Sequence, residues 1–381
     1  MKRIKSSRII LPDGLFAGYL YFDAGKIQYI TDRDLPCSET YDAGDHYVSA
    51  GFIDIHTHGG GGHDFGQTAA STLAAAEFHR KHGTTTICPT ISAAPLENMA
   101  RSARYVQEAM RQAGNRLNIL GAHLEGPYLS QKQCGAQCPD FLTPPEPERY
   151  QPLVAELGGA IARWTYAPEN DTDGRFCDFL VKNGIVPSAG HTDAVYADMA
   201  LALQKGCKLI THLYSCTSTI TRQQGFRRLG VVETAYLEDD LFVEIIADGK
   251  HLPPDLIRLI VKIKGADKVI LVTDSLSLAG TDSTHGFMEQ TEYIIEDGVC
   301  KLMDRSAFAG SIATADRLIR VCVLEAGIDI CEAVKMMTAN PAKAMGLDTK
   351  GSLAPGFDAD IVVFDDRINI RKVFVNGIGV E

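Results

Sequence analysis

Hydrophobic and polar residues follow two different rhythms along the chain. Near both ends, short apolar runs are separated by turn residues, as at 18–22 and 26–30 around the turn 23–25, and again at 359–364 and 372–377. Such runs are typical of antiparallel strands and hairpins. We therefore expect both ends of the chain to form β-structure and to meet in one small sheet domain.

The middle of the chain repeats another unit. Runs rich in β-branched residues end in polar residues, and most are followed by a segment with helical periodicity. The predicted strands are 51–56, 84–88, 118–125, 163–166, 185–191, 209–212, 242–248 and 268–274. Predicted helices between them include 72–82, 96–112 and 193–205. Eight β/α units in about 270 residues favour a (β/α)8 TIM-type barrel, whose active site lies at the C-terminal strand ends. An open doubly wound α/β sheet is the alternative.

These rhythms divide the chain into two predicted domains. Residues 1–50 and 350–381 would form a small β-sandwich, and residues 51–349 a (β/α)8 metal-dependent catalytic barrel. A length of 381 residues suits a barrel with a small companion domain. The segment 134–148 contains four prolines and follows the third predicted strand. We expect it to be a long loop that forms one wall of a pocket.

Composition narrows the class of protein. Hydrophobic residues make up 45% of the chain and charged residues 22%, which is typical of a globular protein. The formal net charge is −11, with 37 Lys and Arg against 48 Asp and Glu, and this argues against a nucleic-acid partner. No apolar run approaches the ~20 residues of a membrane span, so no membrane partner is expected. Pro12 and Asp13 interrupt the apolar stretch that a cleavable signal would need.

Cysteine usage indicates a reducing compartment. The ten cysteines are scattered from Cys37 to Cys331, in a chain large enough to bury its own core. Only Cys134 and Cys138 lie close together in the sequence, and no second pair exists to complete a zinc cage. We therefore expect reduced thiols and a cytoplasmic protein.

Side chains that can bind metals fall at the ends of the predicted strands. They are His56 and His58 (first strand), Glu125 (third), His191 (fifth), His212 (sixth) and Asp274 (eighth). In a barrel these ends converge on one rim. Imidazoles and carboxylates are the ligands expected for zinc or iron in a hydrolytic site. One histidine near a strand end is usually an ordinary core or surface residue, but six such residues together indicate a metal site.

The same stretches carry a resemblance to a known family. The matching segments are 51–58, 82–85, 121–128, 188–193, 211–214, 246–251, 271–274, 308–311, 338–342 and 351–360. Through them the sequence resembles the amidohydrolase superfamily and, within it, the N-acetylglucosamine-6-phosphate deacetylases. The His-x-His pair and the final Gly-Ser-Leu stretch occur throughout the superfamily. His-Leu-Glu-Gly-Pro-Tyr at 123–128 and Ala-Asp-Gly-x-His at 247–251 are much more specific to the deacetylases.

The resemblance implies a metal-dependent amide hydrolase that converts N-acetylglucosamine 6-phosphate into glucosamine 6-phosphate and acetate. Glu125, His191 and His212 would hold the principal divalent metal, zinc or iron. His56 and His58, sharing Glu125, would hold a second, although some family members lack this pair and use one metal. Asp274 would act as general base and then as general acid.

The resemblance also implies contacts to the phosphorylated sugar. His251 and Arg227 would bind the phosphate, with the arginine reaching in from the neighbouring subunit of a homodimer. The residues that would line the sugar site are Ala136, Gln137, Ser215, Cys216, Phe308, Ala309 and Gly310. Gln137 stands where the family usually has histidine, and Ser215 and Cys216 replace its usual Asn and Ala. The loop 219–230 is longer than usual, so Arg222 and Arg228 remain alternatives to Arg227.

Other interpretations remain open. The nearest is an amidohydrolase acting on another N-acylated amino sugar or on an N-acyl amino acid. A non-catalytic sugar-phosphate sensor is the alternative from another class, and loss of Asp274 or of a metal ligand would indicate it. His123 could support a metal ligand or pack in the core. His79 is expected on a solvated helix face, because Arg80 and Lys81 follow it.

Overall fold

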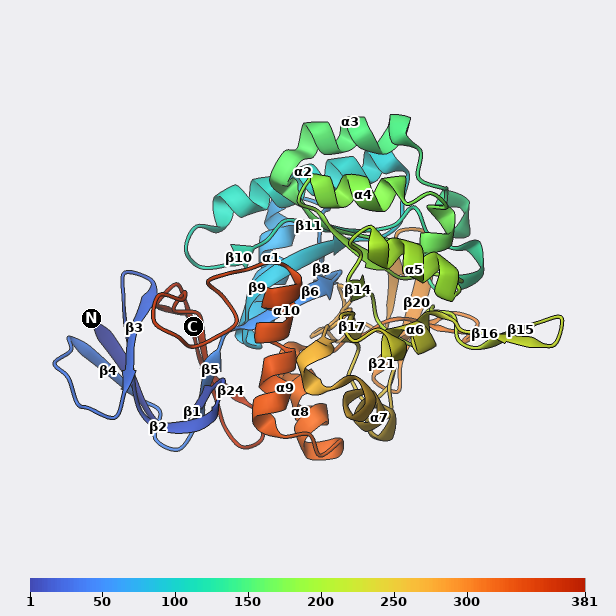
Figure 1. The fold of residues 1–381 in the computed structure, drawn as a ribbon. Coiled ribbons are helices and arrows are strands. Elements are labelled where there is room, and N and C mark those ends of the chain that lie inside the picture. Colours follow the sequence, from blue (N-terminus) through green and yellow to red (C-terminus); the bar gives the residue numbers. More distant parts are fainter. Residues whose placement is uncertain (381) are drawn as a thin grey trace.

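A nearly closed ring of parallel strands, with helices around it, forms the centre of the molecule (Figure 1). The structure, a computed structural model, describes residues 1–380. The ring strands are β6 (Phe52–Thr57), β9 (Thr84–Ile91), β11 (Ala122–Glu125), β12 (Ile161–Tyr166), β13 (Val186–Ala189), β14 (Leu209–Ile210), β17 (Phe242–Ile245) and β18 (Val269–Leu271). Each pairs in parallel with its neighbour in this order, and the short β10 (Asn118–Ile119) adds to β9. All eight predicted strands are confirmed.

A helix follows each strand of the ring and covers its outer face. In the described chain these helices are α1 (Ala69–Lys81), α2 (Leu96–Ala113), α3 (Pro147–Leu157), α4 (Arg175–Lys182), α5 (Tyr196–Gln204), α6 (Val231–Leu237), α7 (Pro254–Lys264) and α8 (Ala315–Arg320). Two more, α9 (Ile330–Met336) and α10 (Ala339–Ala344), lead back to the small domain. Apolar side chains of the helices and strands form one large core, for example Met99, Trp164 and Phe176. The predicted (β/α)8 barrel is therefore confirmed, and the open doubly wound sheet is wrong.

The barrel closes between its first and last strands through side chains as well as backbone. The Asp274 N–H donates to the His56 carbonyl at 2.9 Å. Below this contact, the Thr273 hydroxyl donates to Asp54 Oδ2 at 2.6 Å, and the Asp54 carboxylate is fully buried. This closure brings the ends of β6 and β18 together, and with them two of the predicted site residues.

The two ends of the chain form the second sheet. Its strands are β1 (Lys2–Leu11), β2 (Gly14–Asp23), β3 (Lys26–Thr31), β4 (Glu39–Asp42), β5 (Tyr47–Ala50), β23 (Ile361–Phe364), β24 (Ile370–Val375) and β25 (Ile378–Val380). They enclose one apolar core, which includes Ile4, Leu20 and Phe374. The β2–β3 and β24–β25 hairpins turn on left-handed residue pairs, Ala24–Gly25 and Asn376–Gly377, as two-residue hairpin turns require. The predicted small β domain made from both termini is thus confirmed, while its residue boundaries stay a prediction.

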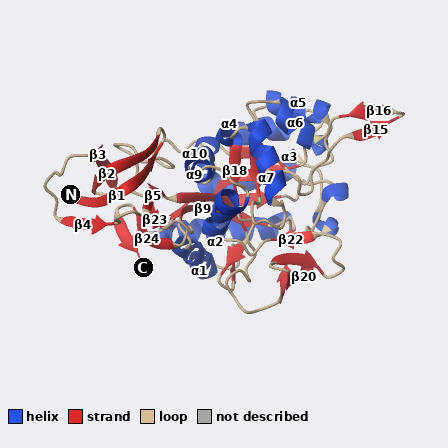
Figure 2. Cartoon of the chain, turned by 90° about the horizontal axis from the view of Figure 1, so that it is seen from below, coloured by secondary structure: helices blue, strands red, loops and turns tan. Residues whose placement is uncertain are grey.

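Additional strands that the sequence pattern did not predict lie in the segments that follow the barrel strands. A four-stranded antiparallel sheet follows β18 and consists of β19 (His285–Met288), β20 (Thr291–Glu296), β21 (Val299–Leu302) and β22 (Phe308–Gly310). A hairpin of β15 (Thr221–Gln223) and β16 (Phe226–Arg228) projects away from the body of the molecule (Figures 1 and 2). A second hairpin, formed by β7 (Gly59–Gly60) and β8 (His63–Asp64), follows β6 directly.

The remaining general expectations concern loops, thiols and membranes. The predicted long loop, 134–148, contains the short 3-10 turn Pro139–Phe141, and its last two residues belong to α3, which begins at Pro147. All ten cysteines are free thiols, as the sequence indicated. Within residues 1–380, no helix combines the length and the apolar character that crossing a membrane requires.

Candidate metal centre and substrate pocket

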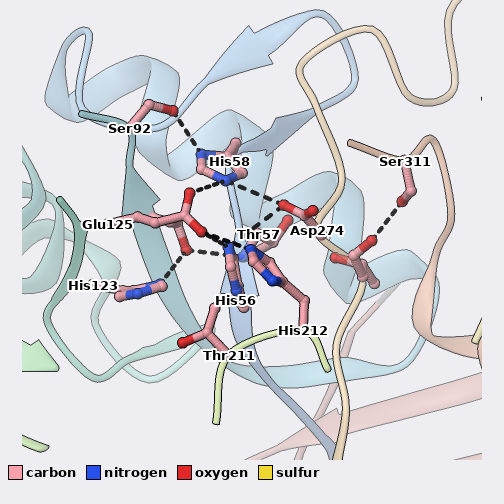
Figure 3. A network of polar contacts seen from close by, with 12 residues as sticks. His56, Thr57, His58, Ser92, His123, Glu125, Thr211, His212, Asp274 and Ser311 are labelled. Atoms are coloured by element: carbon pink, nitrogen blue, oxygen red, sulfur yellow. Dashed lines mark hydrogen bonds and ion pairs between the residues drawn. The ribbon is translucent and has the colours of Figure 1, made fainter. Parts of the chain in front are cut away.

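Six predicted side chains meet at the C-terminal end of the barrel, and Figure 3 labels five of them, all except His191. His56 belongs to β6, and His58 comes directly after the end of that strand; Glu125 is the last residue of β11. His191, His212 and Asp274 lie two or three residues beyond β13, β14 and β18. All six are at least nine-tenths buried. The parallel strands therefore deliver four imidazoles and two carboxylates to one point, as the barrel prediction requires.

The backbone turns sharply at three of these positions. His191, His212 and Asp274 have φ angles of 46°, 28° and 46°, in the left-handed region that non-glycine residues rarely adopt. Such conformations are retained where the surrounding structure holds them, and they concentrate at functional sites. Here each turn directs the side chain across the top of the barrel.

Glu125 is the centre of the cluster. Its Oε1 lies 3.1 Å from His212 Nε2 and 3.3 Å from the Nε2 atoms of both His56 and His191. Its Oε2 lies 3.3 Å from His58 Nε2. Asp274 Oδ1 stands opposite, 3.2 Å from His58 Nε2 and 3.5 Å from His56 Nε2. One carboxylate therefore borders all four imidazoles.

The mutual electrostatics shift the pKa values in this cluster. Burial alone would raise the pKa of Glu125, but the surrounding histidines hold it well below its usual range. Burial also disfavours ionised Asp274, yet His56 and His58 hold its pKa below the ordinary value. Burial lowers the pKa of His56, but the Glu125 and Asp274 carboxylates outweigh this and raise it to about 10. Both carboxylates are therefore ionised at neutral pH, and without a metal His56 carries a proton.

The donor set fits divalent metal ions. Three groups have ligand atoms within 4.8 Å of one another: His56, His58 and Glu125; His56, His212 and Asp274; and Glu125, His191 and His212. The Nε2 atoms of His191 and His212 face each other at 3.1 Å beside Glu125. Within residues 1–380, the buried Nε2 of His56 makes no hydrogen bond. Converging imidazole nitrogens next to buried carboxylates are the environment that zinc and iron prefer.

Neighbouring groups orient several of these side chains. Ser92 Oγ lies 3.0 Å from His58 Nδ1, and the Gln133 carbonyl lies 2.9 Å from His191 Nδ1. These contacts occupy Nδ1 and leave Nε2 for a metal. His123 is buried, with hydrogen bonds to two threonines, and its ring packs edge-on against His56 at 4.7 Å. It therefore packs in the core and against a predicted ligand at once, so both open interpretations apply.

A pocket of about 240 Å³ opens above the cluster. It is lined by the predicted phosphate contact His251 and by every predicted sugar-site residue: Ala136, Gln137, Ser215, Cys216, Phe308, Ala309 and Gly310. His251 Nδ1 lies 2.9 Å from Asp248 Oδ2, and its ring packs against Phe308 at 5.0 Å. Because Asp248 occupies Nδ1, Nε2 is the ring nitrogen left for a ligand. The long loop and the extra sheet after β18 thus both contribute walls to the pocket.

Gln137 has a second set of partners. Its Nε2 donates to Glu125 Oε2 at 2.6 Å, and its Oε1 accepts from the Ala93 N–H at 2.9 Å. These bonds orient Glu125 and leave one amide N–H for a substrate. The predicted sugar contact of Gln137 stays a prediction, and a positioning contact to a predicted metal ligand accompanies it.

The predicted phosphate arginine lies outside this pocket. Arg227 is exposed on the β15–β16 hairpin, and in register it pairs directly with Arg222, while Arg228 pairs with Thr221. Among residues 1–380, no lysine or arginine lines the pocket. The structure therefore does not bring Arg227 to the pocket of its own chain.

Several residues of the site were missed in the sequence. Tyr214 and Met288 also line the pocket. Beneath the cluster, the Arg163 guanidinium and the Glu244 carboxylate form a fully buried ion pair. Both charges lie inside predicted buried strands, and an unpaired charge is very costly there. The sequence signal that could have revealed this pair was the presence of two opposite charges inside runs predicted to be buried strands.

The predicted exposure of His79 is wrong. Its side chain is fully buried on α1, where Nε2 lies 2.9 Å from the Gly59 carbonyl and 3.2 Å from Thr57 Oγ1. Burial lowers its pKa to about 4, so it is neutral at pH 7. The helix turns this residue inward although two basic residues follow it, because α1 packs against the turn after β6.

Comparisons with known proteins agree with this geometry. The Amidohydrolase family matches residues 47–379. An N-acetylglucosamine-6-phosphate deacetylase from Haemophilus influenzae is 35% identical over 345 residues, which cover 89% of this chain and 88% of that protein. An N-acetylgalactosamine-6-phosphate deacetylase from Shewanella sp. is 31% identical over 333 residues, 86% of this chain and 82% of the other.

A solved structure is similar along the whole chain. A mutant of N-acetyl-D-glucosamine-6-phosphate deacetylase from Mycobacterium smegmatis, in complex with N-acetyl-D-glucosamine-6-phosphate, matches with a TM-score of 0.92. The two chains are 29% identical, and the match covers 99% of this chain and 98% of the other. The sequence match and the barrel with its strand-end cluster give the same assignment. This chain belongs to the amidohydrolase family.

Proposed function

We propose that this protein hydrolyses the N-acetyl group of N-acetylglucosamine 6-phosphate, giving glucosamine 6-phosphate and acetate. The observation that carries the proposal is the pocket above the imidazole–carboxylate cluster, in a chain that matches, from end to end, a deacetylase bound to that sugar phosphate. All six predicted strand-end groups are present, which argues against the non-catalytic sensor.

The proposed cofactor is a divalent metal, zinc or iron, with one or two ions per chain. Glu125, His191 and His212 would hold the principal ion, and His56 and His58 with Glu125 a second. When bound, such an ion polarises the amide carbonyl and makes water a better nucleophile near neutral pH. An amide needs this help because it is a poor electrophile with a poor leaving group.

Asp274 is the proposed proton carrier. Its ionised carboxylate, at the mouth of the cluster, accepts a proton from the attacking water as the water oxygen adds to the acetyl carbon. It then delivers that proton to the sugar nitrogen as the C–N bond breaks. The products are the free amine and acetate, so the carboxylate returns to its ionised form.

The sugar phosphate requires cations that one chain's pocket does not provide. A phosphate monoester carries close to two negative charges near neutral pH. His251 lies in the pocket, whereas Arg227 lies on the projecting hairpin. We propose a homodimer in which Arg227 of one subunit completes the phosphate site of the other. The exposed Ile220 and Phe226 beside it, 51% and 77% accessible, support burial of the hairpin against a partner.

The test is acetate release from N-acetylglucosamine 6-phosphate by metal-loaded protein, with the metal content measured on the same sample. We expect multiple turnovers and acetate equal to the amine formed. Bound sugar phosphate without turnover in a metal-loaded sample would favour the sensor instead.

The free thiols support a cytoplasmic location for this activity.

A second candidate substrate is N-acetylgalactosamine 6-phosphate. The Shewanella relative carries that activity in its name and is 31% identical to this chain. The two sugars differ only in the configuration at C4, so the same acetate assay with each epimer decides between them. A higher kcat/KM for the galacto epimer would replace the proposed substrate without changing the proposed chemistry. The other alternative substrate, an N-acyl amino acid, carries no phosphate and would not use the proposed phosphate site.

A further inference from the structure

A buried ion pair lies in the barrel interior beneath the metal cluster. Arg163 on β12 and Glu244 on β17 are both 0% exposed and are hydrogen-bonded to each other. The guanidinium also donates to the Ile55 carbonyl at 3.0 Å and to the hydroxyls of Ser188 and Thr211 at 3.1 Å each. Arg163 is therefore held by strands on several sides of the barrel, and it fixes one oxygen of Glu244.

The other oxygen of Glu244 points upward to the cluster. Glu244 Oε2 lies 3.3 Å from His56 Nδ1 and 3.4 Å from the backbone N–H of His212. Replacing a buried ion pair by apolar residues is often neutral or stabilising, so stability alone is a weak reason for this pair. Its contact with His56 supplies a specific reason.

We propose that Glu244, fixed by Arg163, is the positioning residue for the ligand His56 and thereby sets the affinity of the second metal site. The carboxylate accepts a hydrogen bond from the Nδ1–H of His56, so Nε2 presents its lone pair between Glu125 and Asp274. A carboxylate behind a ligand histidine fixes the ring and makes it a stronger donor. This inference rests on the proposed metal-dependent function.

The other predicted ligands have weaker partners behind them. His58 has the neutral Ser92 hydroxyl, and His191 has the Gln133 carbonyl. Within residues 1–380, the Nδ1 of His212 has no hydrogen-bond partner. Loss of the Glu244 charge should therefore weaken the site that contains His56 much more than the site formed by Glu125, His191 and His212.

The test is Zn²⁺ binding to Glu244→Gln, measured by equilibrium dialysis and elemental analysis at fixed free zinc. The amide is nearly isosteric but removes the charge. We expect wild type to bind two ions, and the variant to keep one tightly while its affinity for the second falls by roughly 10- to 100-fold. The matched control is Asp316→Asn, since Asp316 is another buried carboxylate, paired with His82 and Arg320. That variant should bind both ions as wild type does.

A second variant and a second readout keep the test decisive. Glu244→Asp retains the charge for Arg163 but withdraws the oxygen from His56, so it should lose second-site affinity even where Glu244→Gln fails to fold. In the zinc-loaded protein, the His56 Nδ1 proton should give a downfield NMR signal that Glu244→Gln shifts and Asp316→Asn does not.

Three results would overturn the inference: two ions bound normally by folded Glu244 variants, equal weakening of both ions, or a wild type that never exceeds one. Acetate release by wild type is measured separately, so a failure of the proposed function is distinguishable from a failure of this inference.

Discussion

Asp274 combines a left-handed backbone, deep burial and an ionised carboxylate at the mouth of the cluster. We predict that Asp274→Asn, which keeps the size but cannot accept the water's proton, lowers kcat by about 100-fold or more. The principal metal should remain, because Glu125, His191 and His212 are unchanged. Steady-state kinetics with metal analysis checks this. Near-normal turnover in a metal-loaded variant would remove Asp274 from the proton-carrier role.

His79 predicts a dependence of stability on pH. Its pKa is about 4 when folded and 6.5 in the unfolded chain, so between these values the unfolded chain binds the proton first. Acidification across this window therefore favours unfolding, and the lowered pKa corresponds to roughly 3 kcal/mol. Denaturant unfolding of metal-free wild type and His79→Gln from pH 7 to pH 4 measures it. The wild type should lose more stability than the variant, and parallel curves would contradict the burial argument.

At the residue scale, the sequence predicted those side chains of the site that stand at the C-terminal ends of the barrel strands. His56, Glu125 and Asp274 were predictable because each ends a run that must be buried in a parallel barrel. The charges of Glu244 and Arg163 inside buried runs were a signal, but their pairing was not predictable, since it is a contact across the barrel between strands far apart in sequence. His79 was misassigned because neighbouring charges say little about which side of a helix faces the core.

At the scale of elements, the β15–β16 hairpin tests the phosphate proposal. A charge-assisted contact to phosphate contributes about 1.5–3 kcal/mol, so Arg227→Ala should lower kcat/KM for the phosphorylated sugar by roughly 10- to 100-fold. The unphosphorylated sugar should be almost unaffected. Arg228→Ala is the matched control, because its side chain lies on the opposite face of the two-stranded ribbon, while Arg222 shares the face of Arg227. If Arg222→Ala, Arg227→Ala and Arg228→Ala each affect the two sugars alike, the proposed phosphate contact is contradicted.

The same hairpin shows which secondary-structure elements could not be predicted from the sequence. The barrel strands were predictable because burial on both faces imposes continuous apolar runs. Every residue of β15 and β16 is exposed, so no alternation of apolar and polar residues reveals these strands. The sheet β19–β22 was also missed, although it supplies Phe308, Ala309 and Gly310 to the pocket. Those residues were identified through the family resemblance and not through a strand pattern.

At the scale of the whole molecule, a shared site predicts complementation between subunits. Arg227→Ala has an intact Asp274, and Asp274→Asn has an intact Arg227. After unfolding and refolding together, mixed dimers should contain one complete site, restoring up to about a quarter of wild-type activity by random pairing. Activity with subsaturating phosphorylated sugar checks this. If mixing restores nothing although mixed dimers form, Arg227 does not act across the interface.

The most direct test of the central claim compares acetate release from N-acetylglucosamine with and without its 6-phosphate, using the metal-loaded wild type. The proposed function predicts turnover of both through the same cluster, with kcat/KM higher for the phosphorylated sugar by at least the roughly 10- to 100-fold that one charge-assisted contact provides. Equal kcat/KM for the two sugars, or no acetate from either, would contradict the proposal that this protein is a sugar-phosphate deacetylase.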